Sequence, residues 1–376
     1  MLYGKRMQDI YISGTGVWTP PHTVSNEELV KSFNSYVELY NAEHADDIES
    51  GTIDALEPSS SEFIVKASGI KNRYVIEKES LLDPKCMKPQ IQARDDDSLS
   101  LCAEISVLAA KEALDNAKLT PADIDAVIVS TANLQRAYPA IAIEVQNELG
   151  IEGYAYDMMV GCSSTTFGIS NAYSDIASGK ASRVLVINPE ITTAHNNLKN
   201  RDSHFIFGDV CTAAVIEKDS KSPNKFKILN AKLKTHFSNN IRNNFGFMNF
   251  IEDKKYTEEE LLFVQNGRSV FKEVMPMVAS LISDHLEENN LLPDQVEQYW
   301  LHQANINMNT YVVKKLLGDD FPAERAPNVL DEYANTGSAG SLISFHKYNH
   351  LTAGQKGIIC SFGAGYSICS ILVEKA

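Results

Sequence analysis

Two pairs of segments in this chain repeat each other, and this internal duplication constrains the fold more than any other feature. Residues 109–133, AAKEALDNAKLTPADIDAVIVSTAN, match residues 281–305, LISDHLEENNLLPDQVEQYWLHQAN, element by element. Each has an amphipathic helix, a Pro/Asp turn suited to starting a short helix, an apolar strand and a terminal Ala-Asn. Residues 207–218 and 362–375 both run from Phe-Gly through an apolar strand to Glu-Lys. Because two separate elements recur in the same order, we predict a duplicated fold.

Short apolar runs rich in β-branched residues alternate with helical patterns along the chain. The runs AVIVS, VLVIN, YWLH and GIICS are typical of strands buried on both faces. Their alternation with helices predicts two α/β halves, each a sheet flanked by helices. We place the N-terminal half at residues 1–218 and the C-terminal half at residues 219–376. The acidic segment 34–62 breaks the alternation, so we expect it to be an insertion or a solvated cap.

Charge, hydropathy and cysteine usage exclude several classes of protein. A formal net charge of −15 argues against general binding to nucleic acid. No apolar run approaches the ~20 residues of a membrane helix, and the first residues lack the apolar core of a signal peptide. We therefore expect a soluble, cytoplasmic protein whose six cysteines are reduced. No cysteine or histidine cluster has the spacing of zinc ligands, so we expect no structural metal.

Cys162 stands between an apolar stretch and a predicted helix, in the sequence YAYDMMVGCSSTTFGIS. The helical pattern continues to about Gly179, where it closes. A helix N-terminus stabilises a thiolate through its unpaired N–H groups, and the small neighbouring residues leave room for a substrate. Cys162 is therefore a candidate nucleophile. The alternative is a small buried residue without chemistry, which is the commoner role for a cysteine taken alone.

Three further stretches carry groups that can act beside such a nucleophile. His302 ends an apolar strand in WLHQANINMN, and open α/β sheets bind ligands at the carboxyl ends of their strands. Asn335 lies in the small-residue turn YANTGSAGS, where it can donate from a neutral amide. The turn SFGAGYS can offer backbone N–H groups to an oxyanion. Each stretch also has a purely structural explanation, namely a histidine bonded to backbone, a cap asparagine and a tight turn.

Taken together and in this order, these motifs are specific. A cysteine upstream of HQAN, with NTGSAGS downstream, resembles ketoacyl-acyl-carrier-protein synthase III, a condensing enzyme of the thiolase superfamily. The resemblance runs from ISGTGVWTP to the C-terminus, apart from residues 34–62. It implies an α/β thiolase-like fold in which two duplicated halves form a layered αβαβα core. The Cys-His-Asn set separates this branch from thiolases, which use a second cysteine, and from elongating condensing enzymes, which use two histidines.

The resemblance also implies roles for single residues. Cys162 matches the acyl-accepting nucleophile, and His302 and Asn335 match the pair that handles the malonyl group. The backbone N–H groups of Cys162 and Ala364 match the oxyanion hole, although the family usually has glycine at the second position. The remaining substrate-binding matches are Tyr138, which reaches into the partner subunit's acyl pocket, Phe63 and Arg201, which flank the adenine of coenzyme A, Asn305 near the pantetheine arm, and Gly267.

Docking of the acidic carrier protein is implied at three basic positions, Lys272, Lys314 and Lys315. The family usually follows HQAN with any residue and then an arginine, but here that position holds Asn307. We therefore expect docking to be retained in an altered form.

The implied reaction is a decarboxylative Claisen condensation of an acyl-CoA primer with malonyl-acyl-carrier protein. It passes through an acyl-Cys162 intermediate, gives a 3-oxoacyl-carrier protein that starts or feeds fatty-acid synthesis, and uses no metal or redox cofactor. Three alternatives stay open: a polyketide- or quinolone-type condensing enzyme, an acyltransferase with the same three residues, and a non-catalytic subunit that kept the fold. We also expect a homodimer, because QRAYPA around Tyr138 matches the family's cross-subunit segment. We expect a primer longer than acetyl, because Met158 and Met159 can line an adaptable apolar cavity.

Overall fold

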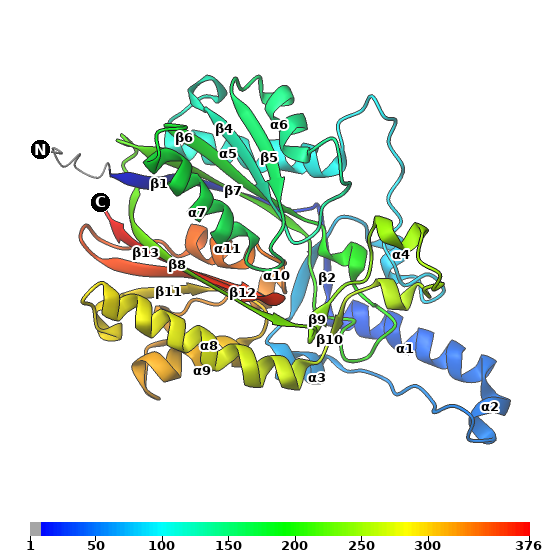
Figure 1. The fold of residues 1–376 in the computed structure, drawn as a ribbon. Helices are drawn as coiled ribbons and strands as arrows, with labels where there is room; N and C mark the ends of the chain where they lie inside the picture. The colour runs from blue at the N-terminus through cyan, green and yellow to red at the C-terminus, as the bar shows by residue number, and fades with distance from the viewer. Residues whose placement is uncertain (1–8) are drawn as a thin grey trace, which may run out of the picture.

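The computed structural model describes residues 9–376, and its described part is built on one nine-stranded sheet with helices on its faces (Figure 1). The strand order is β11-β12-β13-β8-β1-β7-β6-β4-β5. These strands are β1 (Ile10–Trp18), β4 (Ala126–Ser130), β5 (Tyr154–Met158), β6 (Arg183–Glu190), β7 (Val210–Lys218), β8 (Phe226–Ser238), β11 (Gln298–Leu301), β12 (Lys356–Gly363) and β13 (Gly365–Lys375). Two small sheets pair β2 (His22–Ser25) with β3 (Asn72–Val75) and β9 (Ile241–Arg242) with β10 (Val264–Gln265).

The sheet repeats one strand pattern twice, so the predicted duplicated α/β architecture is confirmed. In the first half, β1 pairs antiparallel with β7, β7 antiparallel with β6, and β6 parallel with β4. In the second half, β8, β13, β12 and β11 follow the same order with the same orientations. Two residue pairs, Tyr11 with Lys227 and Ile12 with Phe226, join β1 to β8. The two predicted sheets are therefore continuous at one edge.

Helices and half-sheets alternate in five layers (Figure 1). The α-helices are α1 (Asn26–Glu43), α2 (Ala45–Glu49), α3 (Ser61–Ser68), α4 (Glu79–Leu82), α5 (Leu101–Ala117), α6 (Ile141–Leu149), α7 (Ser164–Ala177), α8 (Gly267–Glu288), α9 (Ile306–Leu317), α10 (Leu330–Tyr333) and α11 (Gly340–Lys347). α5 and α6 pack on the first half, α8 packs on the second half and against α9, and α7 contacts strands of both halves. The order agrees with the expected αβαβα core.

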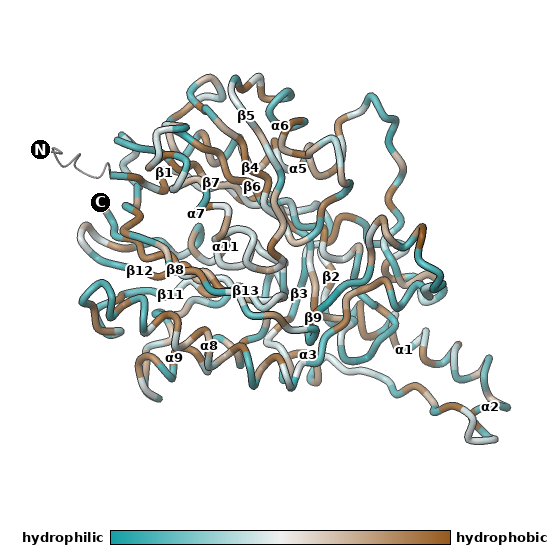
Figure 2. The backbone as a smooth tube through the Cα atoms, in the orientation of Figure 1, coloured by the Kyte–Doolittle hydropathy of each residue, from teal (hydrophilic) through white to brown (hydrophobic). Residues whose placement is uncertain are grey.

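Each layer interface has its own apolar cluster, and Figure 2 shows hydrophobic residues concentrated along the central strands. Between the halves, Ile169 of α7 packs with Ile128 of β4 and Ile371 of β13. On the outer face of the first half, a Cβ at Gly14 of β1 would lie 2.2 Å from the carbonyl oxygen of Ala113 in α5. Glycine is therefore required at this position for α5 to lie so close to the sheet.

The duplicated Pro/Asp turns form short 3-10 helices, as their sequences predict. η1 (Pro121–Asp123) comes directly before β4, and η5 (Pro293–Gln295) comes directly before β11. The other 3-10 helices of the described residues are η2 (Thr192–His195), η3 (Phe247–Phe250), η4 (Glu259–Leu261) and η6 (Ala323–Arg325).

The segment predicted as an insertion, 34–62, begins inside α1 and ends at the start of α3. Val37, near the start of the segment, is buried in an apolar cluster that also contains Leu29 and Phe33 of α1. α2 has no buried residue, and Figure 1 shows α1 and α2 projecting from the body of the molecule. The far end of this segment is thus solvated, whereas its beginning belongs to the core.

None of the described helices is long and apolar enough to span a membrane. Within residues 9–376, no three or more His, Cys, Asp or Glu side chains are grouped to hold a metal ion. All six cysteines carry free thiols.

Candidate active site

Cys162 lies in the connection between β5 and α7, two residues before the helix begins. Gly161 has a positive φ of 53°, and Val160 forms a bridge with Cys162, so the chain turns tightly here. The residue is half-buried, with its sulfur against the end of β12. A Cβ at Gly363 would lie only 2.9 Å from this sulfur, so β12 needs a glycine where it passes the thiol.

Burial raises the pKa of the Cys162 thiol to about 11, and the Glu190 carboxylate adds to this effect. The backbone N–H groups of Ala364 and of Cys162 itself oppose it, because they face the sulfur and stabilise negative charge there. Burial therefore outweighs the stabilisation expected from the start of α7, and the protonated thiol is favoured before substrate binds. The two N–H groups predicted for the oxyanion hole both lower this pKa, and residues 161–162 lie against residues 363–364.

His302 follows β11 directly, and its backbone N–H donates to the Cys360 carbonyl of β12 (2.8 Å). The imidazole is buried and meets the Phe362 ring edge-on, with 5.3 Å between the ring centroids. Burial lowers the pKa of His302 to about 4, so the ring is neutral at physiological pH. Its Nδ1 atom is buried without a hydrogen-bond partner among the described residues.

Asn335 lies in the turn between α10 and α11, and its backbone is hydrogen-bonded to the segment that precedes β7. Its N–H donates to the Ile206 carbonyl (3.0 Å), and its own carbonyl accepts from the N–H of Gly208 (3.1 Å). Its side-chain Oδ1 accepts from the N–H of Gly337 (3.1 Å). Since Oδ1 is engaged within the turn, the amide group offers its Nδ2 hydrogens to a ligand.

Two connections bring the three predicted catalytic residues together. The end of β12 carries Phe362, which contacts His302, and Gly363, which contacts Cys162. Thr165, in the first turn of α7, donates through its hydroxyl to the Ser338 carbonyl (2.7 Å) and ties the helix after the nucleophile to the turn of Asn335. These contacts place His302 and Cys162 beside the end of β12, and they link the turn of Asn335 to the first turn of α7.

Phe63 and Arg201, predicted to flank an adenine, lie against each other. The guanidinium carbon of Arg201 is 4.5 Å from the centroid of the Phe63 ring, and the Arg201 Nε donates to the Pro58 carbonyl (2.8 Å). The structure brings the two side chains together, but in this arrangement they leave no room for a base between them. A purine can stack on both only if Arg201 moves aside.

The other predicted substrate-binding residues are more dispersed. Asn305 caps α9 by accepting from the Asn307 N–H, and its Nδ2 donates to the Ala67 carbonyl of α3 (2.5 Å). Its amide therefore holds α3 and α9 together. Gly267 is the first residue of α8 and is exposed. Tyr138 is 84% exposed in the loop between β4 and α6, so it enters no pocket of its own subunit.

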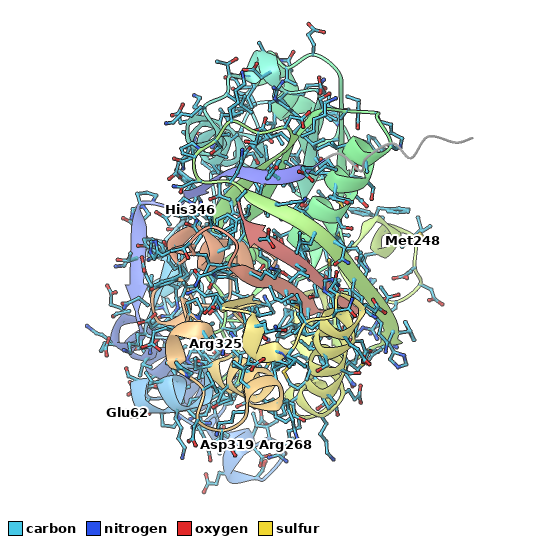
Figure 3. All side chains as sticks on the ribbon, turned by 90° about the vertical axis from the view of Figure 1, so that its left-hand side faces the viewer. Glu62, Met248, Arg268, Asp319, Arg325 and His346 are labelled. Carbon is cyan, nitrogen blue, oxygen red and sulfur yellow. The ribbon has the colours of Figure 1, made fainter. Side chains whose placement is uncertain are left out.

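The predicted docking lysines lie on two packed helices. Lys272 is on α8, whereas Lys314 and Lys315 are in the last turn of α9. Phe271 of α8 meets Tyr311 of α9 edge-on at 5.5 Å, which holds the two helices together. Arg268, which the sequence argument did not include, is exposed in the first turn of α8 (Figure 3). Lys314 forms an ion pair with Asp319 (3.3 Å), so part of its charge is already balanced.

Glu190, the last residue of β6, was not predicted from the sequence. Its carboxyl group is buried, accepts hydrogen bonds from Ser338 in the turn of Asn335, and influences the pKa of Cys162. One signal was available: an acidic residue directly after the apolar run VLVINP, at a strand end where polar groups serve ligands.

Comparison with known proteins shows which family the chain resembles. The family model for 3-oxoacyl-[acyl-carrier-protein] synthase III matches residues 156–236, and the model for the C-terminal part of that enzyme matches residues 286–375. A beta-ketodecanoyl-[acyl-carrier-protein] synthase of Pseudomonas aeruginosa is 53% identical over 349 residues, which cover 92% of this chain and 100% of that protein. A beta-ketoacyl-[acyl-carrier-protein] synthase III of Methylococcus capsulatus is 26% identical, with 96% of this chain and 98% of that protein covered.

Among solved structures, the 3-oxoacyl-[acyl-carrier-protein] synthase III of Aquifex aeolicus superposes with a TM-score of 0.74. The superposition covers 97% of this chain and 99% of that one at 24% identity, so it shows a shared fold. The predicted thiolase-like fold and the resemblance to condensing acyltransferases are thereby confirmed. The chain belongs to the beta-ketoacyl-acyl-carrier-protein synthase III family of condensing enzymes.

Proposed function

We propose that this enzyme condenses an acyl-CoA primer with malonyl-acyl-carrier protein through an acyl thioester on Cys162. The observation that supports this most directly is the packing of residues 161–162 against residues 363–364, which places the backbone N–H groups of Cys162 and Ala364 where both lower the pKa of the Cys162 thiol. When a thioester carbonyl attached to that sulfur becomes tetrahedral, its oxyanion has two preorganised donors within reach.

In the first step, the Cys162 sulfur attacks the carbonyl carbon of the acyl-CoA. The bond between that carbon and the coenzyme A sulfur breaks, the thiol proton ends on the departing coenzyme A, and the acyl group stays on Cys162. Because burial raises the pKa of the thiol, its proton leaves as the substrate binds and reacts and is not lost beforehand.

In the second step, the malonyl group on the carrier protein loses carbon dioxide and becomes an enolate. Burial keeps His302 neutral and Asn335 carries no charge, so both can donate hydrogen bonds to the enolate oxygen. The enolate carbon attacks the acyl-Cys162 carbonyl, the thioester bond breaks, and the released thiolate takes up one proton from solvent. The product is a 3-oxoacyl-carrier protein. Loss of carbon dioxide drives the reaction, which as proposed needs no metal or redox cofactor.

We propose an acyl-CoA of about eight carbons as the primer. The 53% identical relative is named for a beta-ketodecanoyl product, and a ten-carbon product less the two carbons that malonyl contributes leaves an eight-carbon acyl group. Met158, expected to line an acyl cavity, is half-buried beside the apolar cluster between the halves. Met159 is 58% exposed, so Met158 is the better candidate for such a lining.

A series of acyl-CoAs with malonyl-carrier protein tests both proposals. Each buried methylene contributes about 0.8 kcal/mol, or about fourfold in kcat/KM, until the cavity is full. We expect kcat/KM to rise steeply from acetyl- to octanoyl-CoA and to fall for dodecanoyl-CoA. Equal or better use of acetyl-CoA contradicts the eight-carbon primer, and absence of a 3-oxoacyl product with every primer contradicts the condensation.

We further propose that the active form is a homodimer in which Tyr138 enters the acyl pocket of the neighbouring subunit. Tyr138 is an almost fully exposed aromatic side chain, and β5 is an edge strand of the sheet. Along β5, Tyr154 and Tyr156 are only half-buried, so this edge offers both apolar surface and open backbone groups to a second copy. Sedimentation at assay concentrations should show a dimer, and a fully active monomer would refute the proposal.

A further inference from the structure

Glu190 is a buried acid that is hydrogen-bonded to two segments and linked to a third through Ser338. It ends β6, and only 1% of it is exposed. Its Oε1 atom accepts from the N–H of Ala132 (2.9 Å), at the start of the loop that carries Tyr138. The same oxygen accepts from the N–H (3.0 Å) and from the hydroxyl of Ser338, in the turn that carries Asn335. The Ser338 carbonyl accepts from Thr165, so α7 is the third segment.

The second carboxyl oxygen leads directly to Asn335. Oε2 of Glu190 is buried and has no hydrogen-bond partner within the described chain. It lies against Gly337, where an added Cβ would come within 2.7 Å of it. Gly337 has a positive φ of 58°, and its N–H is the donor that orients the Oδ1 of Asn335. The carboxyl group therefore packs against the Gly337 peptide, whose N–H group orients the Asn335 amide.

We propose that Glu190 is a positioning residue for condensation: it fixes the 335–338 turn against α7 and the 131–138 loop so that Asn335 faces the malonyl group. This inference rests on the proposed function. Asn335 acts on the malonyl step, so a displaced turn harms condensation while acyl transfer to Cys162 proceeds. A misplacement of about 1 Å can lower a catalytic step about 100-fold.

The charge of Glu190 gives a second measurable effect, on the pH profile of acylation. A residue that acts only through packing would not change this profile. Burial raises the pKa of Glu190 to about 7, while its hydrogen bonds to Ser338, Ala132 and Thr131 lower it. The ionisable groups that feel its charge are the thiols of Cys162, Cys102 of α5 and Cys211 of β7. Its negative charge raises the pKa of the Cys162 thiol, so a neutral side chain at this position favours the thiolate.

The test measures two half-reactions in three variants. Acylation is followed as the mass gained from octanoyl-CoA, and condensation as product formed when malonyl-carrier protein meets the preacylated enzyme. Glu190→Gln keeps an acceptor oxygen and removes the charge, whereas Glu190→Ala removes both. Glu217→Gln is the matched control, because Glu217 is an equally buried acid on β7 that pairs with Arg183 (3.0 Å) and contacts none of the three segments.

We expect Glu190→Ala to lower the rate of condensation at least about tenfold more than the rate of acylation. In Glu190→Gln, the rate of condensation should be close to that of the wild-type enzyme. We also expect Glu190→Gln to shift the pH profile of acylation to lower pH. Glu217→Gln should change neither the ratio of condensation to acylation nor this pH profile. Equal losses in both half-reactions, or an unshifted profile in a folded Glu190→Gln enzyme, would overturn the proposal.

If Glu190→Ala does not fold, Ser338→Ala removes one donor to the carboxyl group and should give a smaller loss confined to condensation. A Ser338→Ala variant with both steps unchanged also counts against the proposal. Failure of the wild-type enzyme to condense any primer would instead contradict the proposed function, so the two failures are distinguishable.

Discussion

Arg201 lies over the face of Phe63, with its guanidinium carbon 4.5 Å from the ring centroid and its Nε bonded to the Pro58 carbonyl. These residues come from distant parts of the chain, and the resemblance to the family assigns both to the adenine of coenzyme A. Their mutual contact shows that they occupy one site. An adenine that stacks between them, as the resemblance implies, would replace a cation–π contact worth about 0.5–1 kcal/mol at an exposed site.

Arg201→Ala and Phe63→Ala should each weaken recognition of the nucleotide end of the substrate. Stacking of a base on one such group contributes about 1–3 kcal/mol, so KM for octanoyl-CoA should rise roughly tenfold while kcat changes little. Octanoyl-pantetheine, which lacks the adenosine, is the control and should show unchanged kinetics in both variants. If KM rises equally for octanoyl-CoA and octanoyl-pantetheine, Phe63 and Arg201 stabilise the fold and do not bind the nucleotide.

His302→Ala and Asn335→Ala should separate the two chemical steps. Removing one hydrogen-bond donor to a developing oxyanion typically costs about 100- to 1,000-fold, and here the loss should fall on decarboxylation and condensation. Acylation by octanoyl-CoA, read from the mass gained, should change much less. If a variant decarboxylates malonyl-carrier protein normally but no longer accepts the acyl group, the substituted residue acts in acylation and not in the malonyl step.

The raised pKa of Cys162 makes a prediction for the resting enzyme. A thiol with a pKa of about 11, compared with an ordinary value of 9.0, has about 100-fold less thiolate below pH 9. Iodoacetamide should therefore modify Cys162 slowly at pH 7.5, and the rate should rise about tenfold per pH unit up to pH 10. Peptide mapping measures this rate, and half-buried Cys86 is the internal control that should react first. Fast labelling of Cys162 at neutral pH would show a stabilised thiolate instead.

Asn307→Arg should strengthen docking of the carrier protein. Asn307 is exposed in the first turn of α9, and its backbone N–H donates to the Asn305 side chain, so a change of the Asn307 side chain leaves that cap intact. One added surface ion pair contributes up to about 1 kcal/mol, so KM for malonyl-carrier protein should fall about two- to fivefold at low salt. KM for octanoyl-CoA should not change. Lys272→Glu should raise KM for malonyl-carrier protein. If the two substitutions do not change this KM in opposite directions, the carrier protein docks elsewhere.

The sequence was informative where local rules decide the structure. The Pro/Asp turns at Pro121 and Pro293 start short helices in both halves because proline fits the first helical position. The helix after Cys162 closes at Ala177, close to the predicted Gly179, since glycine readily leaves the helical conformation. The repeated segments likewise predicted that the fold is duplicated.

Features that depend on packing could not be predicted in this way. The pKa of Cys162 is set by burial against β12 and by Glu190, and neither is visible in the residues next to the thiol. Likewise, no local pattern shows that Asn305 bonds to Ala67, more than two hundred residues away, or that Arg201 rests on Phe63. The pairing of β1 with β8 also depends on how the two halves meet.

The central claim is that Cys162 carries the acyl group, and intact-protein mass spectrometry after incubation with octanoyl-CoA alone tests it most directly. The wild-type chain should gain the mass of one octanoyl group, peptide mapping should place that group on Cys162, and malonyl-carrier protein should then remove it as a 3-oxoacyl product. Cys162→Ala should gain no mass and form no product from octanoyl-CoA. An octanoyl adduct on another residue, or condensation by Cys162→Ala at the wild-type rate, would contradict the account.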